Sequence, residues 1–216
     1  MRIDIGYVLG KSTEVIQQNP AIFVPSSLPF FIGLILGLLG ISSKTFFVHP
    51  ALGIPNIFGA ILLILVACIA EGAIVFMTKE QLEGKKVSYM EGIGVAAQRL
   101  ADLVVASVII AIGAFVGLVL LVIPGLVWLL LVAFSIQIVM LENLDGVEAV
   151  KRSIKLVREN FGDVFVFLLV LLIILLIVSI VLGLIPVIGS ALASLVTTTY
   201  SGVALTVGYL QLRSES

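Results

Sequence analysis

The chain has 216 residues, of which 61% are hydrophobic and only 12% are charged, and its formal net charge is −1. So few charged side chains cannot cover the surface of a soluble domain of this length, and the chain has no excess of basic residues that would bind nucleic acid. The mean hydropathy of +1.29 is typical of an integral membrane protein. A soluble enzyme and a nucleic-acid-binding protein are therefore not expected.

Six apolar stretches follow one another along the chain, each close to the length of about 20 residues that a helix needs to cross hydrocarbon. They cover residues 21–41, 56–78, 102–123, 125–141, 164–185 and 188–211. Pro124 and Pro186 divide the later stretches into pairs, because proline cannot continue the helical hydrogen-bond ladder. The predicted fold is an all-α membrane protein with six transmembrane helices in three hairpins.

The 12 Lys and Arg residues are unevenly distributed about these predicted spans. All of them except Lys44 lie on the side that holds both termini. Cytoplasmic loops carry an excess of Lys and Arg, so we expect a multi-pass protein of the cell membrane with both termini in the cytoplasm.

The chain has a single histidine and a single cysteine. His49 falls in the longest outer loop, where we expect a solvated or interfacial residue, with a ligand role as the alternative. Cys68 falls within an apolar stretch and is expected to be buried and inert. We therefore expect no metal site, no disulfide and no cofactor.

A shorter amphipathic segment precedes each predicted hairpin, at residues 7–18, 88–100 and 147–161. The single membrane domain, residues 1–216, then consists of three copies of one unit, at about 7–78, 88–141 and 147–211. The motif Glu80–Gly84 recurs as Glu142–Gly146, which favours a pseudo-threefold repeat. Three independent hairpins are the alternative.

The third amphipathic segment has the clearest helical pattern. Its apolar stripe consists of Val147, Val150, Ile154, Val157 and Phe161. The basic residues beside that stripe are Lys151, Arg152, Lys155 and Arg158.

This pattern predicts a helix at the cytoplasmic interface, with its apolar face in the acyl boundary and its basic side chains at the headgroups. Glu148 is expected to pair with Lys151 and Arg152 at helical spacing. The four basic residues are candidate contacts for an anionic lipid or a membrane partner, and a topology anchor is the alternative.

The run from Glu142 to Phe161 also has a recognisable order of residues. An acidic stretch with Gly146 is followed by Ala149–Ser153, then by Leu156–Arg158 and a long apolar span. This order resembles the membrane domain found with some glycerophosphoryl diester phosphodiesterases and related six-span families of unknown function. The resemblance implies a fold and a location rather than an activity, so we expect a non-enzymatic protein without catalytic residues.

Glu71 is the ionisable residue that stands out inside a predicted span. A carboxylate at membrane depth is costly unless it is paired, neutralised or facing water, so Glu71 is a candidate proton- or cation-binding group. A protonated or hydrogen-bonded glutamate that holds two helices together is the alternative. Ser135, Gln137 and Thr206 lie at similar depth on other spans and are its expected partners.

Three classes of function follow from these features. The leading hypothesis is a non-enzymatic protein that acts through its cytoplasmic amphipathic helices. Through them it organises membrane lipids, including anionic ones, or it organises a membrane-protein partner or a second copy of itself. The alternative is a small transporter or channel that uses Glu71. An intramembrane enzyme has the least support, because no predicted span supplies a histidine or an evident metal-ligand partner for Glu71.

Overall fold

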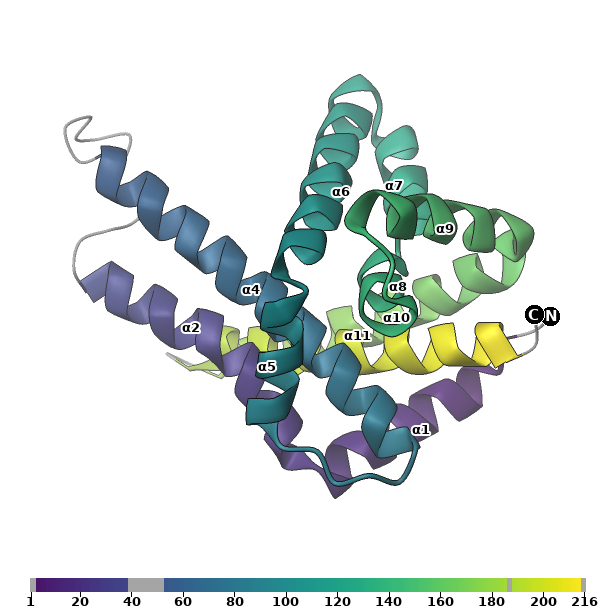
Figure 1. Ribbon diagram of the computed structural model, residues 1–216, viewed down its shortest axis with the longest axis horizontal. Helices are drawn as coiled ribbons and strands as arrows, with labels where there is room; N and C mark the ends of the chain where they lie inside the picture. The colour runs from purple at the N-terminus through teal and green to yellow at the C-terminus, as the bar shows by residue number, and fades with distance from the viewer. Residues whose placement is uncertain (1–2, 39–52, 186–187, 215–216) are drawn as a thin grey trace.

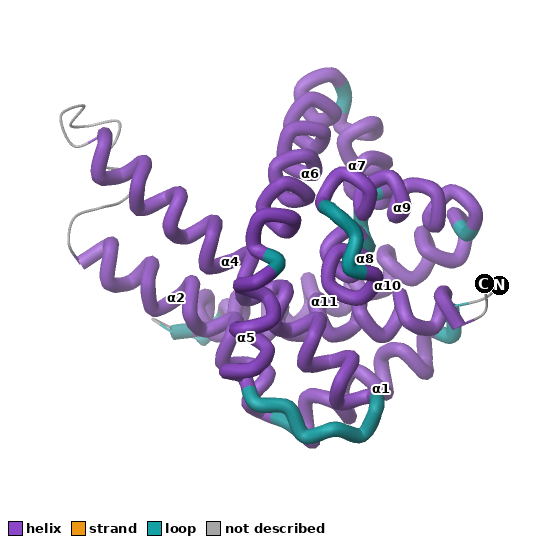
Figure 2. Tube along the Cα trace, viewed as in Figure 1, coloured by secondary structure: helices purple, strands orange, loops and turns teal. Residues whose placement is uncertain are grey.

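The computed structural model describes residues 3–38, 53–185 and 188–214, and all its regular structure is helical (Figures 1 and 2). No strand occurs among these residues. Lys44 and His49, which the sequence places on the outer side, lie outside the described residues. The helices, in chain order, are α1 (Ile5–Gln18), η1 (Pro20–Ile22), α2 (Phe23–Leu38), α4 (Gly53–Leu82), α5 (Tyr89–Gln98), α6 (Leu100–Leu120), α7 (Val122–Leu131), α8 (Ser135–Glu142), α9 (Gly146–Glu159), α10 (Phe161–Gly183) and α11 (Gly189–Ser214).

Three short helices, α1, α5 and α9, lie where the sequence predicts amphipathic segments. Each begins at a residue whose side chain accepts a hydrogen bond from a backbone N–H of the first turn: Asp4, Ser88 and Asp145. Such caps satisfy N–H groups that have no partner within the helix, so they fix where each helix starts.

Five of the described helical segments are long and apolar enough to cross a membrane, which indicates a membrane protein. They are Ile57–Leu82, Leu100–Leu120, Val122–Glu142, Phe161–Gly183 and Gly189–Ser214. The predicted first span, 21–41, is described only to Leu38 and supplies a shorter apolar helix, Pro20–Gly33.

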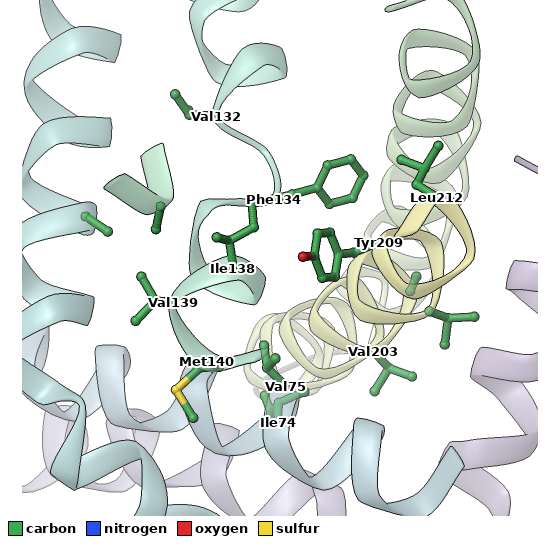
Figure 3. Packing of buried hydrophobic residues seen from close by; sticks show 14 of the residues in the cluster. Ile74, Val75, Val132, Phe134, Ile138, Val139, Met140, Val203, Tyr209 and Leu212 are labelled. Carbon is green, nitrogen blue, oxygen red and sulfur yellow. The ribbon is translucent and has the colours of Figure 1, made fainter. Parts of the chain in front are cut away.

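The buried core lies at one end of the long helices, where the short helices pack against them. The C-terminal halves of α4 and α11 meet α8 there, and Figure 3 shows Phe134 and Tyr209 facing each other at the centre of this region. Their ring centroids are 5.9 Å apart. Both side chains are almost fully buried, so the region around them is the best-packed part of the molecule.

The opposite ends of the long helices expose large apolar side chains. Examples are Phe58, Phe115, Leu120, Ile123, Ile180 and Leu184. Figure 1 shows the α2–α4 pair and the α6–α7 pair extending in different directions away from the core. An apolar surface of this extent suits hydrocarbon chains rather than water.

The two described ends of the chain lie together. Helices α1 and α11 pack against each other, and Asp4 and Ser214 line one groove with Lys11 and Gln211. Figure 1 shows the start of α1 close to the end of α11. The described ends of the chain, near Asp4 and Ser214, therefore lie at the same face of the molecule.

The fourth predicted span is broken rather than continuous. Helix α7 ends at Leu131 and α8 begins at Ser135, with a turn between them. Ser153 of α9 fills the break, because its Oγ donates to the Leu131 carbonyl at 3.0 Å and accepts from the Phe134 N–H at 3.2 Å. Both backbone groups thus obtain a partner at membrane depth, as hydrocarbon requires.

The two echoed motifs adopt different local structures. Gly84 follows α4 with a positive φ of 78°, where glycine is favoured, and ends that helix. Gly146, its predicted counterpart, begins α9, and a side chain there would meet the Asp102 carbonyl at 2.4 Å. The residue with positive φ in the second motif is instead Asn143, so the two motifs are not equivalent in backbone structure.

Candidate functional site

A cavity of about 550 Å³ lies between α2, α4 and α11. Most of its lining is apolar. Four polar side chains complete it: Ser26 of α2, Glu71 of α4, and Ser194 and Thr198 of α11. The cavity thus combines one carboxyl group with three hydroxyl groups in an apolar wall.

Glu71 lies in the middle of α4, about 16 Å from the end of that helix at about 1.5 Å per residue. The side chain is half-buried and points toward α11, where its Oε2 lies 3.5 Å from the position that a Cβ on Gly202 would occupy. Because Gly202 has no side chain, α11 leaves room for the carboxyl group. Among the described residues, Glu71 makes no hydrogen bond and no ion pair, so its charge has no partner there.

Ser26 fixes the wall of the cavity that α2 contributes. Its Oγ donates to the Phe23 carbonyl at 3.0 Å and lies 2.6 Å from Oγ1 of Thr199, which joins α2 to α11. Pro29 lies one turn further along α2 and also lines the cavity. The hydrogen bonds of Ser26 support the helix near a residue that supplies no N–H to the helical ladder.

The predicted partners of Glu71 do not line this cavity. Ser135, Gln137 and Thr206 are buried, but they contribute nothing to its wall. Ser135 and Thr206 instead donate to carbonyl groups of their own segments. Similar depth in the membrane does not predict contact with Glu71, because the direction of a side chain around its helix axis decides which neighbour it meets.

Gln137 nevertheless carries an unusual feature. Its side chain is 2% exposed, and its Oε1 has no hydrogen-bond partner among the described residues. The residue follows the break between α7 and α8 in the most tightly packed part of the molecule. An unpaired buried amide oxygen is costly, so it is available to a water molecule in this region.

Ser194 and Thr198 are among the several polar residues of the sixth predicted span, a set that sequence reasoning identified without selecting these two. They are four residues apart on α11, so they share one face of the helix, and this spacing is the signal that could have found them. Their position in the same cavity wall as Ser26 depends on how α2 packs on α11, which no local pattern contains.

The basic residues of α9 form a second site of interest, but the helix is not arranged as the sequence predicted. Its apolar face, including Ala149, Val150 and Val157, is buried against α6, α7 and α8. The prediction that this face lies in the acyl boundary is therefore wrong, because neighbouring helices cover it. Two residues of the predicted stripe, Val147 and Phe161, remain exposed.

The four basic side chains of α9 differ in their surroundings. Nε of Arg152 lies 3.6 Å from Glu142 of α8, and Nζ of Lys155 lies 3.9 Å from Glu159. Lys151 and Arg158 are exposed and have no acidic partner in the described part of the chain. The predicted pairing through Glu148 is not observed, because Arg152 turns toward Glu142.

Glu142 links α8, α9 and α11. Besides Arg152, its carboxylate accepts a hydrogen bond of 2.5 Å from the hydroxyl of Tyr209. The side chain of Glu142 is only 16% exposed, so this carboxylate depends on both contacts. Arg152 therefore serves the packing of α9 rather than an external ligand.

Several basic residues on other elements are held by acidic neighbours. Lys11 binds Glu14 at 2.9 Å, and Lys85 binds both Glu80 and Glu83 at 2.7 Å. The hydrogen bond with Glu14 raises the pKa of the Lys11 ammonium above its ordinary value, and those with Glu80 and Glu83 do the same for the pKa of Lys85. Lys151 and Arg158 of α9 lack such neighbours among the described residues, as does Lys86 between α4 and α5.

Within the described ranges, no three His, Cys, Asp or Glu side chains come together in a way that would hold a metal ion. Cys68 is buried, as predicted, and its Sγ lies 3.5 Å from Oγ of Ser107.

Comparison with known proteins identifies a family for this chain. The domain of unknown function DUF7847 matches residues 3–212, so the chain belongs to that family. No curated protein and no solved structure matches the chain. The match agrees with the expectation of a family of unknown function, whereas nothing in it links the chain to the membrane domain of glycerophosphoryl diester phosphodiesterases.

Proposed function

We propose that this DUF7847 protein is a six-span, non-enzymatic protein of the cell membrane that binds anionic lipid headgroups at the exposed basic face of α9. Both termini lie in the cytoplasm, and the protein organises lipids, or a membrane partner, around its cytoplasmic face. The observation that carries the proposal is the pair Lys151 and Arg158, which are exposed and lack an acidic partner among the described residues.

Six spans rather than five are supported by the position of the termini. Asp4 and Ser214 line one groove, and a chain whose two ends lie on the same side crosses a membrane an even number of times. Five described helical segments are long enough to cross, and α2 then supplies the sixth span. The packing of α2 along α4 agrees with a first hairpin.

A pseudo-threefold arrangement is supported by the order of the helices. In each third of the chain, a short helix with a side-chain cap precedes two long apolar segments. The backbone differs between Gly84 and Gly146, so the three thirds of the chain correspond in the order of their helices but not residue by residue.

The buried apolar face of α9 supports a specific way of binding lipids. Because most of that face is covered by protein, α9 attracts a membrane mainly through charge and not through insertion of apolar side chains. Each free cation near an anionic surface contributes about 1 kcal/mol, so Lys151 and Arg158 together supply about 2 kcal/mol.

The test compares two charge-matched double variants of the purified protein. Lys151→Gln with Arg158→Gln removes the two unpaired cations of α9, whereas Lys11→Gln with Lys85→Gln removes two cations that are already paired. Native mass spectrometry measures binding of phosphatidylglycerol and of phosphatidylcholine to each. We expect the first variant to bind phosphatidylglycerol about 30-fold more weakly and the second to bind as the wild type does.

Other outcomes of this test would contradict the proposal. Equal losses in both variants would mean that total charge, not α9, attracts the lipid. If the wild type retained the two lipids equally, the protein would not distinguish their headgroups, and the proposed recognition would be wrong. Retention of a second protein chain in place of lipid would assign the basic face of α9 to a membrane-protein partner or another copy of this chain.

A second candidate function, a small transporter or channel, is favoured by the cavity at Glu71. The carboxyl group faces a space of about 550 Å³ between three long helices. Protein reconstituted into vesicles should then carry cations or protons at a rate that falls in Glu71→Gln while the variant remains folded. Unchanged flux in that variant would eliminate this candidate.

A further inference from the structure

We infer that the cavity between α2, α4 and α11 binds a protonated amine that carries an apolar body, with Glu71 as its counter-ion. The inference deepens the second candidate function and rests on the cavity that supports it. Binding does not require transport, so the two can be tested separately.

The first argument is the unbalanced charge of Glu71. Its carboxyl group lies within a long apolar helix, and no described residue donates to it or pairs with it. A carboxylate at such depth is stable only if a proton or a cation accompanies it. A bound ammonium group would supply that charge from outside the chain.

The second argument is the state of the hydroxyl groups on α11. Thr197, Thr199, Ser201 and Thr206 each donate to a carbonyl group of their own helix. Ser194 and Thr198, which line the cavity, make no such bond within the described residues. Their oxygen atoms are therefore free to accept hydrogen bonds from a ligand.

An ammonium group matches this set of acceptors. It carries three N–H donors and accepts nothing, and the cavity offers the carboxylate of Glu71 with the hydroxyl oxygen of Thr198, one helical turn from Gly202, and that of Ser194 one turn further along the wall. A bare metal cation matches less well, because hard cations take six or more oxygen ligands and the remaining wall is mostly apolar.

The third argument is the apolar side of the cavity. Phe30 and Ile64 belong to its lining and are 44% and 54% exposed, so the cavity opens onto the apolar outer surface of α2 and α4. A ligand with an apolar body can enter from that surface, and its apolar body then packs against Pro29, Phe30 and Leu63.

The experiment measures binding of phenethylamine to the full chain in detergent micelles by saturation-transfer NMR, with 2-phenylethanol as the uncharged analogue. We expect phenethylamine to bind the wild type, 2-phenylethanol to bind at least about tenfold more weakly, and Glu71→Gln to lose about tenfold in affinity for the amine. Glu159→Gln, which removes an exposed carboxylate of α9, should bind as the wild type does.

A second variant protects the test against a folding defect in Glu71→Gln. Ala67→Phe keeps the carboxyl group but fills the cavity, so it should also abolish binding while circular dichroism stays unchanged. The inference is overturned if the amine does not bind, if the uncharged analogue binds equally, or if both variants bind as the wild type does. Micelles permit no flux, so binding measured in micelles does not depend on transport. Absence of transport in vesicles would therefore eliminate the second candidate function without changing the binding result.

Discussion

At the scale of single residues, Ser153 joins α9 to the break between α7 and α8. It is fully buried, and its hydroxyl bridges two backbone groups of another helical segment across the break between Leu131 and Ser135. Apolar surroundings raise the cost of leaving these groups unpaired, because no water replaces the lost partner.

Ser153→Ala should therefore lower the free energy of unfolding by about 1–3 kcal/mol, since it leaves the Phe134 N–H and one acceptor site of the Leu131 carbonyl unpaired. Unfolding in mixed micelles, followed by circular dichroism, measures this change. Thr13→Ala is the matched control, because the hydroxyl of Thr13 bonds only to the Leu9 carbonyl of its own helix at an exposed position. Equal effects of the two changes would mean that the bridge adds nothing to stability.

At the scale of helices, α6 and α7 depend on close approach of their backbones. A Cβ on Gly117 would lie 2.7 Å from the Cα of Gly125 and 2.9 Å from its nitrogen. Backbone atoms cannot move aside as a flexible side chain can, so the two helices meet only because both positions are glycine.

Gly117→Ala should force α6 and α7 apart and destabilise the protein by about 1–3 kcal/mol. The same unfolding assay applies, and Gly162→Ala in α10 is the control, because nothing lies within 4 Å of its Cβ position. The control should be neutral or slightly stabilising, since alanine favours a helix over glycine. A stable Gly117→Ala protein would show that the pair tolerates wider spacing.

At the scale of the whole molecule, the shared position of the termini makes a prediction about topology. In sealed cells, a cysteine at Ser214 should be protected from a membrane-impermeant maleimide, and one at Ile123 in the first turn of α7 should react. Ile123 is 74% exposed, whereas the native Cys68 is 7% exposed and should contribute little background. Labelling of Ser214→Cys with protection of Ile123→Cys would reverse the proposed orientation.

The features that sequence reasoning located correctly are local ones. Long apolar runs and the positions of the short helices follow from neighbours within a few positions. The break at Val132–Phe134 was missed because it contains neither proline nor glycine and depends on Ser153, which is distant in the chain. The surroundings of Glu71 were missed for the same reason, because helix rotation is set by packing.

The bridge made by Ser153 also sets an order on biosynthesis. Leu131 and Phe134 leave the ribosome before Ser153, from which they are separated by 22 and 19 residues. Until α9 has been made and has docked, the protein offers no partner for the Phe134 N–H through this contact. The fourth span therefore reaches its final bent form only after the helix that follows it is in place.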